Sequence, residues 1–328
     1  MRRIIPAALV CSTAVLGLSG CSQEVDPTVA TDGLRETQWG LDEIGVPYVW
    51  AQGYTGEDVV IAILDTGIDT GHPDLRAHIV DGYDFIDDDR HPKDENGHGT
   101  HVAGIAAGEA NNKGIIGAAP GAKIMPLRVL DSDGAGTNAH IAEAIDWAVD
   151  HGANVINLSL DETGLRGRIS KGGIINDAIE RAHDNDVIVV AASGNNRETG
   201  NQYKFGTHVL VVNATNVLGL PALYSNAGDE RAVAAPGSDI VSTVPTYATT
   251  LYPDGSDGYE TMSGTSMASP LVAGAVALLL SAGVPAQEVP HLLAETAHND
   301  WELTRLDAGI IDVEAALTEA QAQGLTSP

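Results

Sequence analysis

The hydrophobic positions of this chain fall into short continuous runs that alternate with segments of helical periodicity. The first run, residues 59–64, has the sequence Val-Val-Ile-Ala-Ile-Leu. A run without polar positions is typical of a parallel strand that is buried on both faces of its sheet. Similar runs follow at residues 123–130, 153–160, 187–192 and 209–212. The pattern therefore predicts a series of buried parallel strands.

The segments between the runs have the spacing of amphipathic helices. The clearest one has Thr137 as a candidate N-cap and Gly152 as a stop signal, and residues 174–185 repeat its pattern less strongly. Its apolar positions share one helix face and are Ile141, Ala144, Ile145, Ala148 and Val149. Strands that alternate with such helices predict right-handed crossovers and a parallel sheet that helices cover on both faces.

One further segment, residues 267–282, is apolar on all sides and carries Pro270 in its first turn. Its length of about 16 residues is too short to span about 30 Å of hydrocarbon, so we interpret it as a buried core helix. No linker rich in glycine and proline divides the chain after residue 39. We therefore predict one domain over residues 39–316 and a C-terminal tail over residues 317–328.

The N-terminal residues have the pattern of an export signal. Arg2 and Arg3 precede a short, mostly apolar stretch that ends in Leu-Ser-Gly-Cys at Cys21. This ending resembles the lipobox of bacterial lipoproteins, in which the chain is cut before the cysteine and the cysteine carries the lipid. We expect a signal peptide over residues 1–20, then lipidated Cys21 and a polar tether through residue 38. The alternative is an ordinary secretory signal in which Cys21 is incidental.

Removal of such a signal would also remove Cys11 and leave Cys21 as the one cysteine, so no intramolecular disulfide could form. The domain would then lie outside the cytoplasm and would contact the membrane or envelope through the N-terminal lipid alone. We expect a monomer.

The charge is strongly acidic, with 45 Asp and Glu residues against 17 Lys and Arg residues, a formal net charge of −28. Such a surface repels phosphate backbones, which excludes nucleic-acid binding, and it also excludes adsorption of a basic patch to an anionic membrane. We interpret the acidity as a device for solubility.

Three polar residues stand where predicted strands or helices meet turns. Asp65 follows the first strand in Asp-Thr-Gly, and His98 lies in Asn-Gly-His-Gly-Thr-His ahead of an apolar segment. Ser266 lies in Gly-Thr-Ser-Met-Ala-Ser-Pro at the start of the buried helix. Each alone is equally consistent with a cap, a turn residue or a structural histidine. Together they supply the nucleophile, the base and the orienting carboxylate that acyl transfer requires.

These three motifs, in the chain order Asp, His and Ser, resemble the signatures of the subtilase family of serine peptidases over residues 39–316. The resemblance implies a three-layer αβα subtilisin-like fold with a mainly parallel central sheet and a buried helix that carries the nucleophile. It also implies a serine endopeptidase that cleaves extended polypeptides. Asp65 would then orient His98, which acts as base and later as acid, and Ser266 would be the nucleophile.

The segment Ala-Ser-Gly-Asn, which ends at Asn195 directly after a predicted strand, resembles the oxyanion hole of the family. The Asn195 amide would add a second donor to the backbone N–H of Ser266 at the helix N-terminus. The alternative is an asparagine that only stabilises a turn.

The resemblance also indicates a substrate-binding segment at Ser159 and Leu160, which would pair with an extended peptide. Asp161 and Glu162 stand where the family usually has glycines, and we expect an acidic rim that favours Lys or Arg in the substrate. The alternative is a carboxylate that points into solvent. The other residues predicted to contact substrate are Ala192, Ser193 and Gly194.

Residues 109–115 resemble the high-affinity calcium loop of the family, and hard Ca²⁺ prefers oxygen ligands. The predicted ligands are the side chains of Asp74 and Asn111 and the backbone carbonyls of Glu109, Lys113 and Ile115. A simple turn is the alternative. The other histidines show no zinc spacing such as His-Glu-x-x-His. The motifs do not separate broad degradation from the processing of one envelope partner, and a catalytically silent binding module remains a further alternative.

Overall fold

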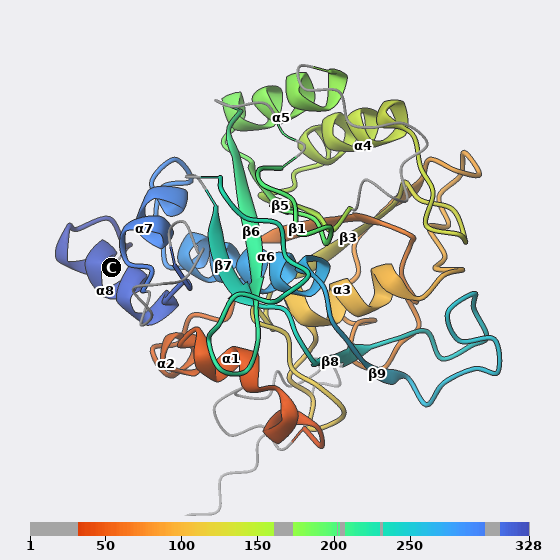
Figure 1. Cartoon of the computed structure of the whole chain (residues 1–328), viewed down its shortest axis with the longest axis horizontal. Helices are drawn as coiled ribbons and strands as arrows, with labels where there is room; N and C mark the ends of the chain where they lie inside the picture. Colours follow the sequence, from red (N-terminus) through yellow and green to blue (C-terminus); the bar gives the residue numbers. More distant parts are fainter. Residues whose placement is uncertain are drawn as a thin grey trace, which may run out of the picture.

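A computed structural model of the chain describes residues 32–160, 173–201, 203, 207–229, 232–298 and 309–327. At its centre lies a seven-stranded sheet in the order β2-β3-β1-β4-β5-β6-β7 (Figure 1). Within the described residues, the strands of this sheet pair in parallel throughout. The strands are β1 (Val60–Asp65), β2 (Tyr83–Asp84), β3 (Lys123–Arg128), β4 (Val155–Leu158), β5 (Ile188–Ala192), β6 (Val209–Thr215) and β7 (Val233–Pro236).

The position of β1 in the sheet explains why its residues 60–64 are all apolar. Ile61 and Ile63 belong to one core cluster, whereas Ala62 and Leu64 belong to a second cluster. Because successive side chains of a strand point to opposite faces, the two clusters lie on the two sides of the sheet. A run with no polar alternation is therefore what a strand buried on both faces requires.

Two pairs of helices cover the two faces of the sheet (Figure 1). The first pair is α4 (Asn138–Asp150) and α5 (Ile174–Asp184), and the second is α3 (His98–Ala107) and α6 (Thr265–Ser281). The apolar residues of each pair fall in a different core cluster, which confirms the predicted three-layer arrangement. The predicted N-cap of α4 is also confirmed, since Thr137 Oγ1 accepts a hydrogen bond from His140 N at 3.2 Å.

The apolar segment after Ser266 forms helix α6, which is buried through residue 279. It is therefore the core helix that the pattern predicted. Along the part of the chain that the structure describes, no helix combines the length and the apolar character that crossing a membrane requires.

Smaller elements complete the described fold. They are the 3₁₀ helix η1 (Arg35–Thr37), the helices α1 (Trp39–Glu43), α2 (Val46–Ala51), α7 (Val289–Glu295) and α8 (Val313–Ala322), and the strands β8 (Ile240–Thr243) and β9 (Tyr259–Met262). Strands β8 and β9 form an antiparallel pair outside the main sheet.

The predicted domain, residues 39–316, was too short at both ends. The predicted tail begins inside α8, where Leu317 and Ala320 are buried, and Ser327 N donates to Ala282 O at 2.9 Å. The end of the predicted tether is also folded, because the buried amide of Gln38 donates to Ile116 O at 2.6 Å. A polar side chain that is buried through such a bond leaves no trace in the hydrophobic pattern. The predicted signal peptide and Cys21 lie outside the described residues.

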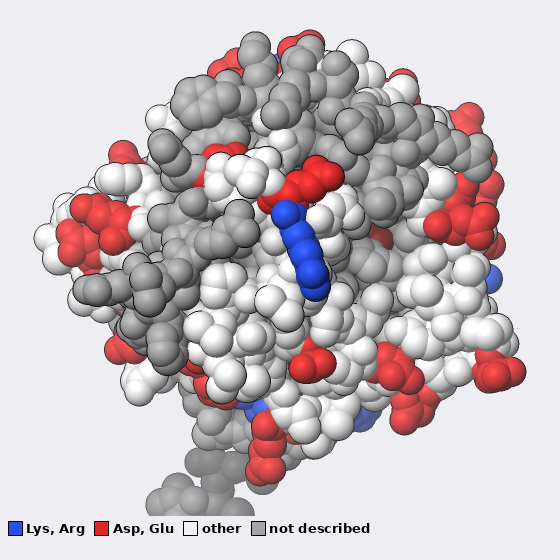
Figure 2. All heavy atoms as spheres, viewed as in Figure 1, with Lys and Arg blue, Asp and Glu red and all other residues white. Residues whose placement is uncertain are grey.

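The acidic excess is spread over the surface rather than gathered in one patch on the face that Figure 2 shows. Acidic side chains occur around the rim of this face, and one basic side chain lies near its centre (Figure 2).

Candidate active site

Asp65 and His98 meet at the edge of the sheet where the parallel strands end. Asp65 is the last residue of β1, and His98 is the first residue of α3. His98 Nδ1 donates to Asp65 Oδ1 at 2.7 Å. The Asp65 carboxylate is fully buried, whereas 20% of the His98 side chain is exposed. The pair therefore has a buried acceptor and an imidazole that reaches the surface.

Glycine permits this approach. A Cβ at Gly99, in the first turn of α3, would lie 2.2 Å from Gly67 O and 3.1 Å from the Asp65 Cβ. Any larger residue would push the turn after β1 away from α3. The glycine that follows His98 in the sequence is therefore a requirement of this close packing.

Asp94 connects the two segments, and the sequence analysis did not identify it. Its Oδ1 accepts hydrogen bonds from Thr66 Oγ1 at 2.9 Å, Asn96 N at 3.0 Å and Gly97 N at 2.8 Å. Its Oδ2 accepts from Thr100 N at 2.9 Å and Thr100 Oγ1 at 2.6 Å. Because Asp94 is fully buried, these contacts fix the loop before α3 against the turn after β1. The sequence signal was weak, since an aspartate two residues before Asn-Gly is typical of any turn.

The electrostatic environment raises the pKa of His98 and lowers that of His101. Burial alone would lower the pKa of His98, but the charge of Asp65, its hydrogen bond and the charge of Asp94 together raise it above 6.5. His101 lies one turn further along α3, where burial, with a smaller contribution from His98, lowers its pKa to about 3. His101 is therefore neutral, and its Nε2 lies 3.1 Å from Glu260 O.

Ser266 is the second residue of α6, so it lies at the N-terminus of the buried helix. Its Oγ donates to Ser159 O at 3.3 Å, and Ser159 Oγ donates back to Ser266 O at 2.9 Å. Ser269 Oγ donates to Asn157 Oδ1 at 2.7 Å, and Asn157 Nδ2 donates to Ser159 Oγ at 2.9 Å. These bonds attach the first turn of α6 to the end of β4.

A cavity of about 340 Å³ brings Ser266, His98, Ser159 and Asn195 together. Asn195 Oδ1 accepts from Thr265 N at 2.9 Å and from Thr265 Oγ1 at 3.1 Å. Within the described part of the chain, the Asn195 Nδ2 group has no hydrogen-bond acceptor of its own. The cavity thus contains an imidazole, a hydroxyl and an amide donor that is held by its oxygen.

The residues predicted to bind substrate follow strands β4 and β5 at the same edge. Gly194 has a φ of +105°, and a Cβ there would lie 2.6 Å from Asn226 Nδ2, which donates to Ser193 O at 2.9 Å. Ala192 ends β5. Leu160 is 1% exposed, so its side chain belongs to the core and only its backbone can face a substrate. Asp161 falls outside the described residues, and its acidic rim stays a prediction.

The predicted calcium loop contains two buried carboxylates. Asp74 Oδ1 accepts from Asn111 Nδ2 at 3.2 Å, and Asp74 Oδ2 accepts from Ile115 N at 3.0 Å. Asp32 Oδ1 accepts from Lys113 N at 2.8 Å. Asp32 Oδ2 and Asn111 Oδ1 are buried without a hydrogen-bond donor in the described structure. Burial raises the pKa of Asp32, and the charge of Asp74 adds to this effect.

Sequence reasoning missed Asp32, because it lies in a polar segment without periodicity. No group of three or more His, Cys, Asp or Glu side chains within the described ranges is arranged to hold a metal ion. A cation at this loop would therefore need the amide oxygen of Asn111 and backbone carbonyls in addition to the two carboxylates.

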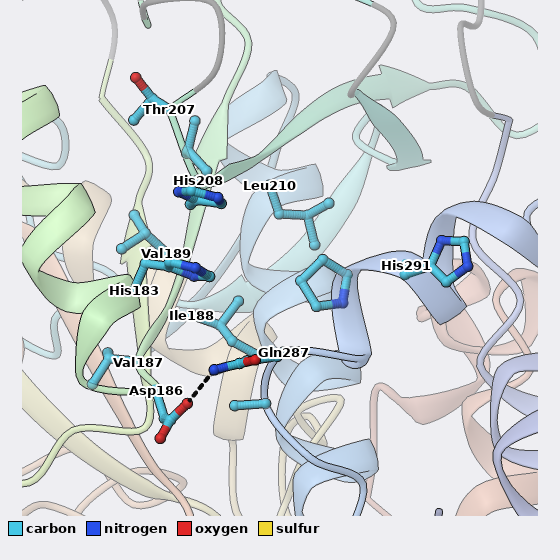
Figure 3. A pocket seen from close by; sticks show the side chains of 13 residues that line it. His183, Asp186, Val187, Ile188, Val189, Thr207, His208, Leu210, Gln287 and His291 are labelled. Carbon is cyan, nitrogen blue, oxygen red and sulfur yellow. Dashed lines mark hydrogen bonds between the residues drawn. The ribbon is translucent and has the colours of Figure 1, made fainter.

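A second cavity, also of about 340 Å³, lies at the opposite end of the strands (Figure 3). Most of its wall is apolar and comes from the starts of β5, β6 and α7. The rings of His183 and His208 stack with centroids 3.7 Å apart, and Gln287 Nε2 donates to Asp186 Oδ1 at 3.2 Å (Figure 3). Neither His98 nor any other candidate catalytic group lines this cavity, so it is separate from the site above.

Comparison with known proteins agrees with this geometry. The model of the subtilase family matches residues 56–324. Subtilisin DY from Bacillus licheniformis is 38% identical over 285 residues, which cover 85% of this chain and 97% of the relative. Thermitase from Thermoactinomyces vulgaris is 40% identical over 262 residues, 79% of this chain and 88% of the relative. A solved structure of a protease from Pseudoalteromonas arctica PAMC 21717 covers 89% of this chain and 99% of its own, with a TM-score of 0.79 and 32% identity.

Proposed function

The chain belongs to the subtilase family and is a serine endopeptidase, and on that premise we propose that Ser266 is its nucleophile, His98 its general base and Asp65 the orienting carboxylate. The observation that carries this assignment is the 2.7 Å hydrogen bond from His98 Nδ1 to buried Asp65, beside a cavity that also contains Ser266. The substrates we propose are extended polypeptides.

The reaction begins when the Ser266 hydroxyl turns from Ser159 O toward His98 Nε2. Such catalytic hydrogen bonds are often loose before substrate binds. Ser266 Oγ then attacks the scissile carbonyl carbon and its proton passes to His98, where the charge of Asp65 stabilises the imidazolium. The imidazolium gives the proton to the leaving amine, and water hydrolyses the resulting acyl-enzyme ester by the same steps.

Asn195 and the N-terminus of α6 support stabilisation of the oxyanion. The Ser266 N–H lies in the first turn of the helix, where the backbone donors and the helix dipole favour negative charge. The two bonds from Thr265 hold the Asn195 oxygen and leave the amide N–H groups as donors. In subtilisin, loss of one such donor lowers kcat by about 10²–10³-fold.

The acyl part of the substrate would lie along the backbone after β4 and β5. The residues that we propose contact it are Ser159, Leu160, Asp161, Ala192, Ser193 and Gly194. The carboxylate of Asp161 would favour Lys or Arg near the scissile bond. Cleavage profiles of a peptide library test this preference, and an unchanged profile in Asp161→Gly contradicts it.

We also propose a structural calcium ion at the loop of residues 109–115. The buried, unpaired oxygens of Asp32 and Asn111 beside Asp74 fit a hard cation. The complete ligand set would be the side chains of Asp32, Asp74 and Asn111 and the carbonyl oxygens of Glu109, Lys113 and Ile115. When bound, the ion would neutralise the two carboxylates and hold the N-terminal segment against this loop.

Export with a lipid on Cys21 is the location that we propose, on the basis of the Arg2-Arg3 start and the Leu-Ser-Gly-Cys ending. Metabolic labelling with a radioactive fatty acid tests it. Label should enter the parent protein and not Cys21→Ser, and an unlabelled parent contradicts lipidation.

Labelling with a fluorophosphonate probe tests the nucleophile. The probe should modify the parent protein and leave Ser266→Ala unlabelled. Equal labelling of both proteins would place the nucleophile elsewhere, and an unlabelled parent would remove the assignment. Circular dichroism of Ser266→Ala checks that the variant is folded.

A further inference from the structure

The connection between β8 and β9 reaches across to the loop that precedes His98. It comprises residues 244–258 and is the long blue-green excursion to the right of the label β9 in Figure 1. Thr250 N donates to Glu95 O and Leu251 N donates to Asn96 O, each at 3.0 Å. Two backbone hydrogen bonds therefore fix residue 251 next to the segment that ends in His98.

Side chains hold this connection from both ends. A Cβ at Gly97, which has a φ of +118°, would lie 2.9 Å from a ring carbon of Tyr252, so the Tyr252 ring packs directly on the backbone before His98. Thr246 donates to Asp69 Oδ2 from its N at 3.0 Å and from its Oγ1 at 2.8 Å. The connection is therefore attached to both segments that carry Asp65 and His98.

Leu251 lines the catalytic cavity together with His98 and Ser266. Its side chain is 45% exposed, although the backbone N–H groups of residues 250 and 251 are fixed by hydrogen bonds. Binding an apolar group against such a side chain is favourable, because it removes apolar surface from water.

The reaction chemistry indicates which side of the scissile bond lies against Leu251. The acyl part stays bonded to Ser266, along the backbone after Ser159. The leaving amine takes its proton from His98, so it lies on the side of His98 and of the loop to which Leu251 is attached. Met262, at the end of β9, lines the same cavity as Leu251.

We propose that Leu251 forms an apolar subsite for the first residues on the leaving-group side of the scissile bond and gives the enzyme a preference for apolar residues there. This inference rests on the proposed function. It concerns selection between substrates and not the bond-making steps themselves.

Acyl transfer to added amines tests the subsite, because an attacking amine takes the position that the leaving amine occupied. A peptide methyl ester forms the acyl-enzyme, which is partitioned between water and the amides of leucine, glycine or arginine. The amine nitrogen bonds to the acyl carbon, Ser266 Oγ leaves, and His98 moves the proton from nitrogen to Oγ. The acyl part is constant, so each product ratio reports the leaving-group side alone.

The parent should transfer to leucine amide in preference to glycine amide. Leu251→Ala should reduce this preference by about three- to ten-fold, as expected for a partly covered side chain. Leu251→Glu should reduce it further and should raise capture by arginine amide relative to leucine amide. Leu218→Ala is the matched control, because Leu218 is 66% exposed and is not on the cavity wall, and it should keep the parent ratio.

Fluorophosphonate titration gives the active-site concentration in each sample. Labelled Leu251→Ala and Leu251→Glu proteins with the parent ratios would overturn the subsite and leave the proposed function intact. A change that follows the acyl residues of the ester and not the amine would also overturn it. An unlabelled parent would instead remove the proposed function and the subsite with it.

Discussion

Replacement of Asp94 by asparagine should destabilise the fold strongly, although the two side chains have nearly the same shape. The carboxylate accepts five hydrogen bonds, three at Oδ1 and two at Oδ2. Asparagine offers one oxygen and one NH₂ group, so in either orientation at least two buried donors lose their acceptor. A hydrogen bond to a charged group contributes about 1.5–3 kcal/mol. The free energy of unfolding should therefore fall by about 3–6 kcal/mol, a large part of the roughly 5–15 kcal/mol of a typical domain.

Urea unfolding followed by circular dichroism measures this loss. Parent and variant are both prepared with Ser266→Ala, which prevents self-digestion during the titration. Asp146→Asn is the matched control, because Asp146 pairs with Arg181 on the surface, where such a pair contributes about 0–1 kcal/mol. A decrease below about 1 kcal/mol for Asp94→Asn would refute the reasoning that these five contacts fix the loop before His98.

Three further predictions concern pH and calcium. The neutral form of His98 is the base and its pKa is raised, so the acid limb of the pH profile of kcat/KM should have its midpoint above pH 6.5. Asp65→Asn should shift this midpoint to lower pH and lower kcat by about 10⁴-fold. A chelator should lower the Tm of the parent and should leave the Tm of Asp32→Asn almost unchanged. Calorimetry measures both values, and an equal decrease of Tm in the two proteins would contradict the calcium site. Burial lowers the pKa of His78 to about 4 and that of His101 to about 3, so the unfolded chain binds their protons first as pH falls below 6.5. Each histidine should lower the free energy of unfolding by about 1.4 kcal/mol per pH unit, down to pH 4 for His78 and pH 3 for His101. Denaturant titrations at a series of pH values measure this, and the free energy of unfolding of His78→Gln should fall less steeply with decreasing pH than that of the parent.

The strands of the sheet and its central helix follow from local patterns. The apolar run of β1 predicted a strand buried on both faces, and the structure places its alternate residues in two separate cores. The apolar segment after Ser266 predicted the buried helix α6. These features depend on the burial of each residue within its own element, and a continuous apolar run displays that burial directly in the sequence.

The predicted C-terminal boundary was wrong for a different reason. Leu317 and Ala320 continue the apolar spacing of α8, so the local pattern itself extends the domain beyond residue 316.

The local sequence places Asp65, His98 and Ser266 at the ends of predicted strands and helices, and parallel strands bring such ends to one edge. The roles of Asp94, which fixes the loop before His98, and of Leu251, which reaches the catalytic cavity, become visible in the folded chain alone. Both depend on hydrogen bonds between loop segments that are distant in the chain or lack any regular period. A polar contact of this kind is set by the path of the backbone in space, so no local arrangement of hydrophobic and polar residues encodes it.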